Sequence, residues 1–157
     1  MRNHGHGILV VPTLLTLLAG TGCATDMNHV SPEVRTAVEA KFPDAAVKEV
    51  EQESCCLYEI ELAHKDVDHE LKVHRNGTII EIETEIEASA LPQPVADTMA
   101  KKLKDHKPDE IERVERLGRQ TLTGAEAMTE TEVYYEIEWT VSGFEKEIKV
   151  NADGTLR

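Results

Sequence analysis

Two cysteines and two histidines are the residues of this sequence best suited to metal or redox chemistry. Cys55 and Cys56 are adjacent, and neighbouring cysteines can form a strained, reducible disulfide or bind a soft metal. His64 and His69 flank a short segment with two aspartates, and we expect them opposite each other near a hairpin tip. Imidazoles with carboxylates can hold zinc or copper. The alternatives are one buried and one exposed thiol, a bridge between molecules, and a solvated hairpin tip.

A larger candidate feature is a series of glutamates that alternate with apolar residues. Such alternation places the glutamates on one face of a sheet. Like charges directly across strands are destabilising, so a basic partner surface or a weakly bound cation would offset their repulsion; a solvated sheet face is the alternative. The candidate binding surface consists of Glu59, Glu61, Glu70, Glu81, Glu83, Glu85, Glu136, Glu138 and Glu147.

The sequence contains no recognisable catalytic set. Motifs of nucleophile elbows, zinc proteases, P-loops and dinucleotide-binding folds are absent from the sequence, as is a calcium loop of the EF-hand type. Aromatic residues make up 4% of the chain, which argues against a large cofactor pocket. We therefore expect a protein that is not an enzyme and that carries no cofactor.

The elements that must position these residues occur twice. An offset of 77 residues places YEIELAHKDVDHELKVHRNGTI, from Tyr58, over YEIEWTVSGFEKEIKVNADGTL, from Tyr135, without a gap. Nine of the 22 aligned positions are identical, including the turn residues Gly and Thr. Agreement at turn positions is more than two unrelated amphipathic strands would share, so we interpret it as an internal duplication.

Each copy predicts a β-hairpin with a defined register. In the first copy we expect Ile60 opposite Val73, which also places the two histidines opposite each other and closes the turn on 66–67. In the second copy we expect Ile137 opposite Val150 and a turn on 143–144, where glycine suits a type II′ turn. The Asx-Gly pairs at 76–77 and 153–154 predict a further turn after each hairpin.

A helix and a strand precede each hairpin. Ser31 followed by Pro32 predicts the start of the first helix, which should end before Pro43. The spacing of Val95, Met99 and Leu103 predicts the second. First strands are expected at 45–53 and 109–117, a strict fourth strand at 78–87 in the first copy only, a linker at 88–94, and a long polar loop at 118–130.

The first 22 residues have the composition of an export signal. Arg2 precedes an apolar stretch that is short and interrupted by Pro12, which argues against a membrane span. The small residues before Cys23 resemble the lipobox of bacterial lipoproteins, and that resemblance implies lipidation of Cys23 and anchoring to a membrane. Ordinary signal cleavage nearby or an uncleaved anchor are the alternatives.

Charge narrows the class of partner. The chain has 17 basic and 30 acidic residues and a net charge of −13. This charge argues against nucleic acid, whose phosphates require Lys and Arg, and favours cations or basic protein surfaces.

The order of these motifs resembles a known family. A helix ending in KFPDA, a strand, and then YEIEL, HELKV and NGTIIEIE resemble the PepSY-like, β-lactamase-inhibitor-like domains. The resemblance implies an α+β fold of two modules, residues 30–87 and 91–157, each a helix on an antiparallel sheet, with the sheet shared. It implies a protein-binding role in the bacterial cell envelope, on the periplasmic face of a membrane or at the cell surface, with inhibition of an envelope peptidase as one form, and it supplies no catalytic residues. The alternative function is a metal- or redox-responsive envelope protein that uses the cysteines and histidines.

Overall fold

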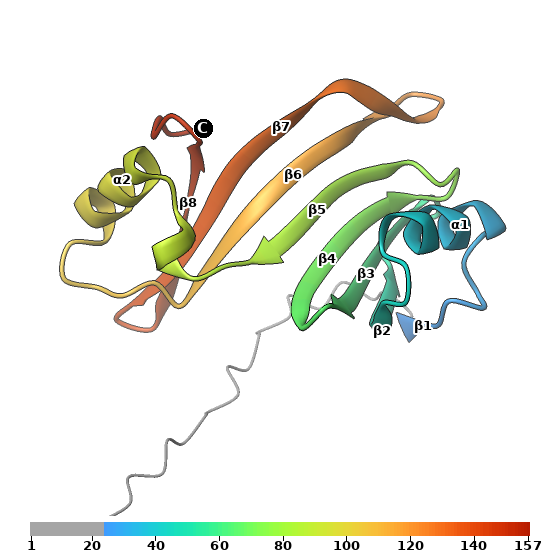
Figure 1. The fold of residues 1–157 in the computed structure, drawn as a ribbon, viewed down its shortest axis with the longest axis horizontal. Helices are drawn as coiled ribbons and strands as arrows, with labels where there is room; N and C mark the ends of the chain where they lie inside the picture. Colours follow the sequence, from blue (N-terminus) through green and yellow to red (C-terminus); the bar gives the residue numbers. More distant parts are fainter. Residues whose placement is uncertain (1–23) are drawn as a thin grey trace, which may run out of the picture.

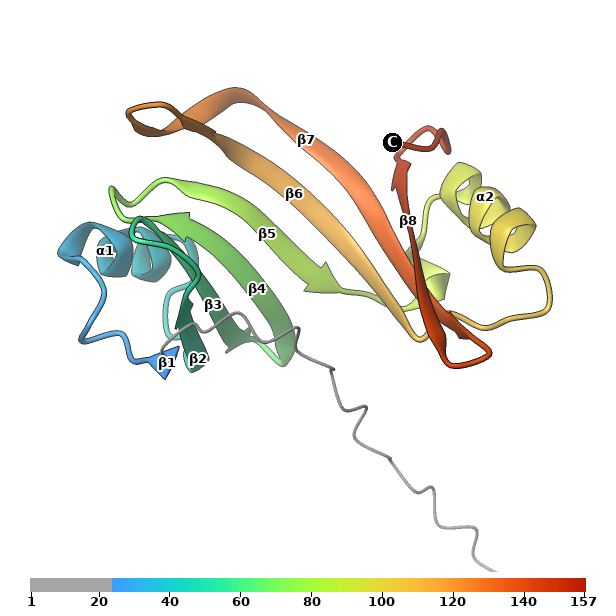
Figure 2. The same ribbon diagram turned by 180° about the vertical axis from the view of Figure 1, so that it is seen from behind.

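The computed structural model describes residues 24–157, which form one antiparallel sheet and two α-helices. The eight strands of these residues lie in the sheet in the order of the sequence, so each pairs with its neighbours along the chain. Figures 1 and 2 show a long, curved sheet with the two helices near opposite ends. The elements are β1 (Ala24–Thr25), α1 (Pro32–Lys41), β2 (Ala46–Gln52), β3 (Leu57–His64), β4 (Val67–His74), β5 (Ile79–Glu85), a 3₁₀ turn η1 (Ala88–Ala90), α2 (Gln93–Leu103), β6 (Glu110–Thr121), β7 (Gly124–Val141) and β8 (Phe144–Asn151).

Both helices pack on the same face of the sheet, which we call the helix face. Directly opposed residues of neighbouring strands point to the same side, and the partners Leu71–Ile82, Ile82–Glu115 and Ile111–Ile137 carry this face across the molecule. The alternate residues of each strand point to the other side of the sheet and form the open face, which no helix covers within residues 24–157. The helix face therefore contains two buried clusters, one beneath each helix. They consist of Val30, Val34, Val38, Phe42, Val50, Tyr58, Ile60, Leu62, Leu71, Val73 and Ile82, and of Val95, Leu103, Ile111, Tyr135, Ile137, Trp139 and Val150.

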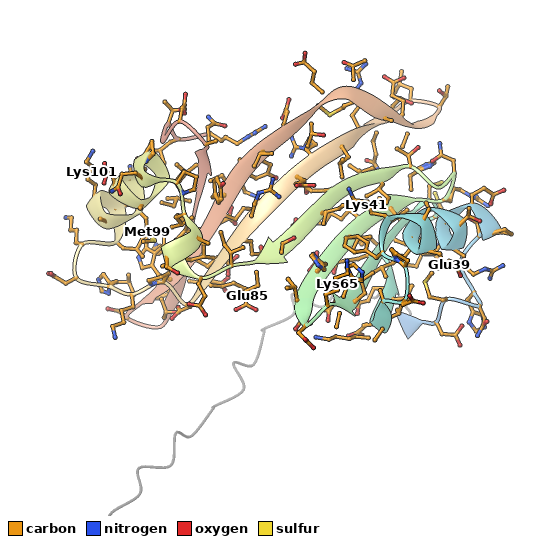
Figure 3. All side chains as sticks on the ribbon, viewed as in Figure 1. Glu39, Lys41, Lys65, Glu85, Met99 and Lys101 are labelled. Atoms are coloured by element: carbon orange, nitrogen blue, oxygen red, sulfur yellow. The ribbon has the colours of Figure 1, made fainter. Side chains whose placement is uncertain are left out.

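The predicted boundaries of the first helix are confirmed, whereas the second helix begins at Gln93, inside the segment 88–94 that was expected to be a linker. Ser31 is the N-cap of α1, with its side chain accepting a hydrogen bond from the backbone N–H of Val34, and proline follows at the first helical position. In α2, Val95 and Leu103 are buried and Met99 packs beside them. Figure 3 labels Lys101 on the outer side of this helix.

The Asx-Gly turns hold the helices against the sheet. Gly77 has a φ of 84° and Gly154 a φ of 88°, which glycine adopts without strain. A Cβ atom at Gly77 would lie 2.8 Å from the carbonyl oxygen of Glu33 in α1, and one at Gly154 would lie 2.6 Å from that of Pro94 in α2. The same close approach therefore recurs at an offset of 77 residues, the offset of the sequence alignment above.

The expected hairpin register is wrong by two residues. Ile60 lies opposite Leu71 instead of Val73, and Ile137 lies opposite Ile148 instead of Val150. Because side chains alternate with a period of two, this shift leaves every residue on its expected face. The apolar pattern alone cannot distinguish the two registers.

The turns explain the observed register. Lys65 and Asp66 close the first hairpin with φ values of 54° and 63°, and Ser142 and Gly143 close the second with 54° and 81°. Two consecutive positive φ values belong to a type I′ turn rather than the expected type II′ turn, and type I′ matches the twist of the strands.

The prediction of a long polar loop at 118–130 is also wrong. Gly118 pairs with Ala127 and Thr121 with Gly124, so β6 and β7 continue to a tight turn. Asn76 Nδ2 donates a hydrogen bond of 2.8 Å to the Ala125 carbonyl. The tip of the hairpin is thereby attached to the turn that follows β4. Polar residues on both faces of these arms conceal the alternation that normally reveals a strand.

Candidate functional site

The expected glutamates share the open face, and the strand pairing places many of them directly opposite one another. Glu70 lies between Glu61 on β3 and Glu83 on β5. Glu112 on β6 lies between Glu85 on β5 and Glu136 on β7. Further pairs join Glu110 to Glu138 and Glu138 to Glu147, and Lys72 lies between Glu59 and Glu81. The open face therefore carries rows of carboxylates that run across the strands.

All of these carboxylates except Glu59 and Glu147 line a groove of about 380 Å³ that extends from β2 to β8. Both halves of the sheet contribute to it, with Glu61, Glu70 and Glu83 on one side and Glu112, Glu136 and Glu138 on the other. Figure 3 labels Glu85 between the two helix-bearing halves. The groove is thus a single acidic surface to which the strands on both sides of the β5–β6 pairing contribute.

Two lysines provide only part of the counter-charge. Lys72 Nζ lies 3.1 Å from Glu83 Oε1 and 3.7 Å from Glu70 Oε1. Lys149 Nζ lies 2.6 Å from Glu136 Oε1 and 3.2 Å from Glu147 Oε1. Burial opposes the charge of Lys72, but the carboxylates of Glu83 and Glu70 outweigh this effect and raise the pKa of the Lys72 ammonium group.

The crowding of carboxylates raises their pKa values. Burial, followed by repulsion from Glu83 and Glu59, raises the pKa of Glu70 to about 8. Burial, followed by repulsion from Glu83 and Glu110, raises the pKa of Glu112 to about 8. Both groups therefore keep a proton through most of the neutral range.

The same effect continues toward β8. Burial and a hydrogen bond with Glu145 raise the pKa of Glu138 to about 7. The pKa values of Glu59, Glu83 and Glu110 are raised as well, in each case chiefly by burial. A positive group placed in the groove would favour the ionised form of these carboxylates and lower their pKa values.

A separate polar network neutralises Glu81. Tyr134 Oη donates a hydrogen bond of 2.9 Å to Glu81 Oε2, and Arg116 Nε donates one of 3.1 Å to the same oxygen. Burial and this contact with Glu81 raise the pKa of Tyr134. Arg157 lies over the Tyr134 ring, with its guanidinium carbon 4.3 Å from the ring centroid. This network ties β5, β6 and β7 together beside the groove.

Sequence reasoning missed Glu112, which lies in the middle of one acidic row, and Glu110, which lies at the end of another. The alternation of Glu110, Ile111 and Glu112 was a usable signal. It was obscured because Arg113 and Glu115 put charged residues on the helix face, in the part of the sheet between the two buried clusters.

The cysteine pair lies in the loop between β2 and β3. Cys55 and Cys56 are free thiols whose Sγ atoms are 3.1 Å apart. Cys55 is exposed and Cys56 is half-buried. The hydrogen bond with Cys56 raises the pKa of the Cys55 thiol.

The histidines lie at the other end of β3 and are not opposite each other. His64 pairs with Val67, and His69 pairs with Leu62. Both imidazole rings contact the ring of Phe42, with centroid distances of 5.5 Å and 4.7 Å. Burial, followed by the proximity of His64, lowers the pKa of His69.

The four residues expected to form a metal or redox site are therefore not brought together. The length of β3 places the cysteines roughly 20 Å from the histidines. Among residues 24–157, no group of three or more His, Cys, Asp or Glu side chains is arranged to hold a metal ion. Cys23 and the expected export signal at 1–22 lie outside the described residues.

Comparison with protein families identifies the class of this chain. The family described as "Putative beta-lactamase-inhibitor-like, PepSY-like" matches residues 22–81 and again residues 75–156. The chain belongs to this PepSY-like family.

Solved structures with the same fold come from Bacteroides species. A protein described as a putative periplasmic protein from Bacteroides eggerthii aligns with a TM-score of 0.67 and 14% identity, covering 82% of this chain and 86% of that one. A BLIP-like protein from Bacteroides fragilis aligns with a TM-score of 0.61 and 17% identity, covering 82% of this chain and 83% of that one. A DUF2874 family protein from Bacteroides ovatus aligns with a TM-score of 0.63 and 13% identity, covering 81% of this chain and 84% of that one. At these identities the likeness establishes the α+β fold alone.

No curated protein matches this sequence. Within residues 24–157, neither helix is long and apolar enough to cross a membrane.

Proposed function

We propose that this protein is a non-enzymatic binding module of the bacterial cell envelope that recognises a basic surface of another protein through its open face. The observation that carries this proposal is the direct opposition of carboxylates across the strands at Glu61–Glu70–Glu83 and Glu85–Glu112–Glu136. Burial and mutual repulsion keep Glu70 and Glu112 protonated near neutral pH in the free protein, and Lys or Arg side chains of a partner would supply the counter-charge that lets them ionise.

The tandem arrangement supports a large contact surface. We take residues 30–87 and 91–157 as two PepSY-like modules, and β5 of the first pairs with β6 of the second. Their open faces would then form one surface rather than two separate sites. A partner that spans the β5–β6 junction would contact both modules at once, which favours a protein over a small molecule.

The location in the envelope rests on the sequence and on one relative. The solved relative from Bacteroides eggerthii is described as a putative periplasmic protein, and the first 22 residues here have the composition of an export signal. We propose that Cys23 carries the lipid that tethers the domain to a membrane. Mass spectrometry of the mature N-terminus tests this, since an acylated Cys23 is the expected result and a chain that retains residues 1–22 would contradict it.

The binding surface can be tested by chemical cross-linking in envelope preparations followed by affinity capture. Changing Glu61, Glu138 and Glu147 together to glutamine removes charge from the open face and leaves the partly buried ion pairs of Lys72 with Glu83 and of Lys149 with Glu136 in place. We expect this variant to lose the captured partner, and capture by the unaltered protein to weaken as salt is raised.

A control variant removes two charges of the same kind from the other face. Glu33 and Glu39 are exposed on α1, and Figure 3 labels Glu39 there, away from the open face. Changing both to glutamine should leave capture intact. Equal loss in the two variants, or capture that does not respond to either, would contradict recognition through the open face. An inhibitory role is tested by adding the purified protein to the captured partner, if that partner is a peptidase.

A further inference from the structure

The Cys55–Cys56 pair is a chemical feature that the acidic surface does not use. The two thiols lie 3.1 Å apart on adjacent residues, and the outer one is open to solvent. The backbone of this loop is hydrogen-bonded to the turn after β4, because Arg75 N–H donates to the Cys56 carbonyl at 2.7 Å. A change in the loop is therefore transmitted to that turn.

We propose that Cys55 and Cys56 form a reversible vicinal disulfide when they meet a disulfide oxidant. The exposed Cys55, as thiolate, attacks one sulfur of the oxidant; the oxidant's S–S bond breaks and one thiolate leaves. Cys56, as thiolate, then attacks Cys55 Sγ of the mixed disulfide, closes the internal bond and releases the second thiolate. The protein loses two electrons to the oxidant and two protons to solvent.

The bond would be labile rather than permanent. A trans peptide fixes neighbouring Cα atoms about 3.8 Å apart, below the 4.4 Å at which the usual disulfide range begins. The ring that closes must therefore distort the peptide units on either side of the pair. Strained and exposed disulfides are readily reduced, so this pair suits a switch that is set and reset.

A chain of hydrogen bonds connects the cysteines to the start of α1. Arg75 N–H is bound to the Cys56 carbonyl, the Ser31 hydroxyl donates to the Arg75 carbonyl at 2.7 Å, and the Val34 N–H donates to Ser31 Oγ at 3.2 Å. Rotation of the Cys56 peptide during ring closure displaces Arg75, and with it the partner that orients the N-cap. Oxidation should therefore loosen the first turn of α1.

The second copy provides an internal reference. It has no cysteine, and the N-cap position of α2 is Pro92, which makes no side-chain capping bond. The response to oxidation should thus be confined to α1.

The test is equilibration of the whole protein in buffers of reduced and oxidised glutathione, followed by acid quenching and peptide mass mapping. Trypsin releases residues 49–65, which contain both cysteines of the pair and not Cys23. We expect this peptide to lose the mass of two hydrogens in oxidising buffer and to regain it in reducing buffer. A peptide that carries only glutathione, or that links two chains, would overturn the proposal.

Hydrogen exchange of the same samples tests the link to the helix. In the oxidised protein, amides at the start of α1 should exchange several-fold faster, while those of α2 keep their rate. The Cys56→Ser variant should show no change in α1 under the same buffers. In the Ser31→Ala variant, α1 should exchange faster already in the reduced state and gain little more on oxidation. An internal disulfide that leaves α1 exchange unchanged would show that the pair does not act through this helix.

Discussion

At the scale of single residues, Glu112 is the most informative position in the groove. It lies directly between Glu85 and Glu136, and its pKa of about 8 means that folding keeps a proton on a group that the unfolded chain releases near pH 4.5. A folded-state pKa above the unfolded value removes stability as the pH rises between these two values.

Replacing Glu112 by glutamine should therefore stabilise the protein at pH 8. The amide cannot ionise, so the cost of a buried charge and the repulsion from Glu83 and Glu110 are removed, and we expect a gain of about 0.5–1 kcal/mol in the free energy of unfolding. The gain should shrink as the pH falls and vanish below about pH 4.5, where both states of the natural protein are protonated. Urea unfolding at the two pH values measures it, with Glu39→Gln on α1 as the control. A variant less stable than the natural protein at pH 8 would contradict this account.

At the scale of elements, the turn after each hairpin decides how closely a helix approaches the sheet. Gly77 faces α1 and Gly154 faces α2, whereas Gly143 has a similar φ of 81° with no atom within 4 Å of a Cβ placed there. These three positions separate the effect of backbone conformation from the effect of contact.

Changing each of these glycines to alanine should give two levels of destabilisation. In Gly143→Ala the only cost is that of alanine at a positive φ, which should lower the free energy of unfolding by about 1 kcal/mol. Gly77→Ala and Gly154→Ala also force a helix away from its turn, and we expect losses of about 2–4 kcal/mol. Thermal or urea unfolding of the three variants provides the comparison. Equal losses at all three positions would mean that the helix contacts contribute nothing.

The helices and strands also show which parts of the fold could be predicted from the sequence alone. The spacing around Ser31 and Pro32 correctly predicted α1, and alternation correctly predicted the faces of β3, of β4 and of β5 from Glu81 onward. The hairpin register could not be obtained in this way, because a shift of two residues buries the same side chains. The choice depended on positive φ values at Lys65 and Asp66, for which the residue types give only a weak signal.

The candidate site was predictable to a similar extent. The nine expected glutamates all lie in the strands or at their ends on the open face, but the sequence could not show that β5 pairs with β6. That contact joins the two acidic rows and brings Glu112 between Glu85 and Glu136. The proximity of the two thiols follows from their adjacency, whereas their link to Ser31 through Arg75 depends on the fold.

At the scale of the whole molecule, the raised glutamate pKa values predict how stability depends on pH. The pKa values of Glu70 and Glu112 are about 8 and that of Glu138 is about 7. The folded protein therefore binds more protons than the unfolded chain in this range, and stability should increase as the pH falls from 8.5 to 6.5. The lowered pKa of His69 acts in the opposite sense, but below about pH 6.5.

Melting temperatures measured between pH 8.5 and 6.5 test this expectation. The unaltered protein should melt at a higher temperature at pH 6.5 than at pH 8.5. A triple variant with Glu70, Glu112 and Glu138 changed to glutamine should show a flatter profile, because it lacks the groups that bind these protons. A profile that rises toward alkaline pH in the unaltered protein would contradict the assignment.

The strand order has a consequence for folding kinetics. Every strand pairs only with the strands that precede and follow it along the chain, from β1 to β8. Five of these pairings close over the short connections β2–β3, β3–β4, β4–β5, β6–β7 and β7–β8. Contacts of short sequence separation form faster than distant ones. The sheet can therefore grow strand by strand from either end, and the β5–β6 pairing, which must close over η1 and α2, is the step expected to limit the rate at which the two halves become one sheet.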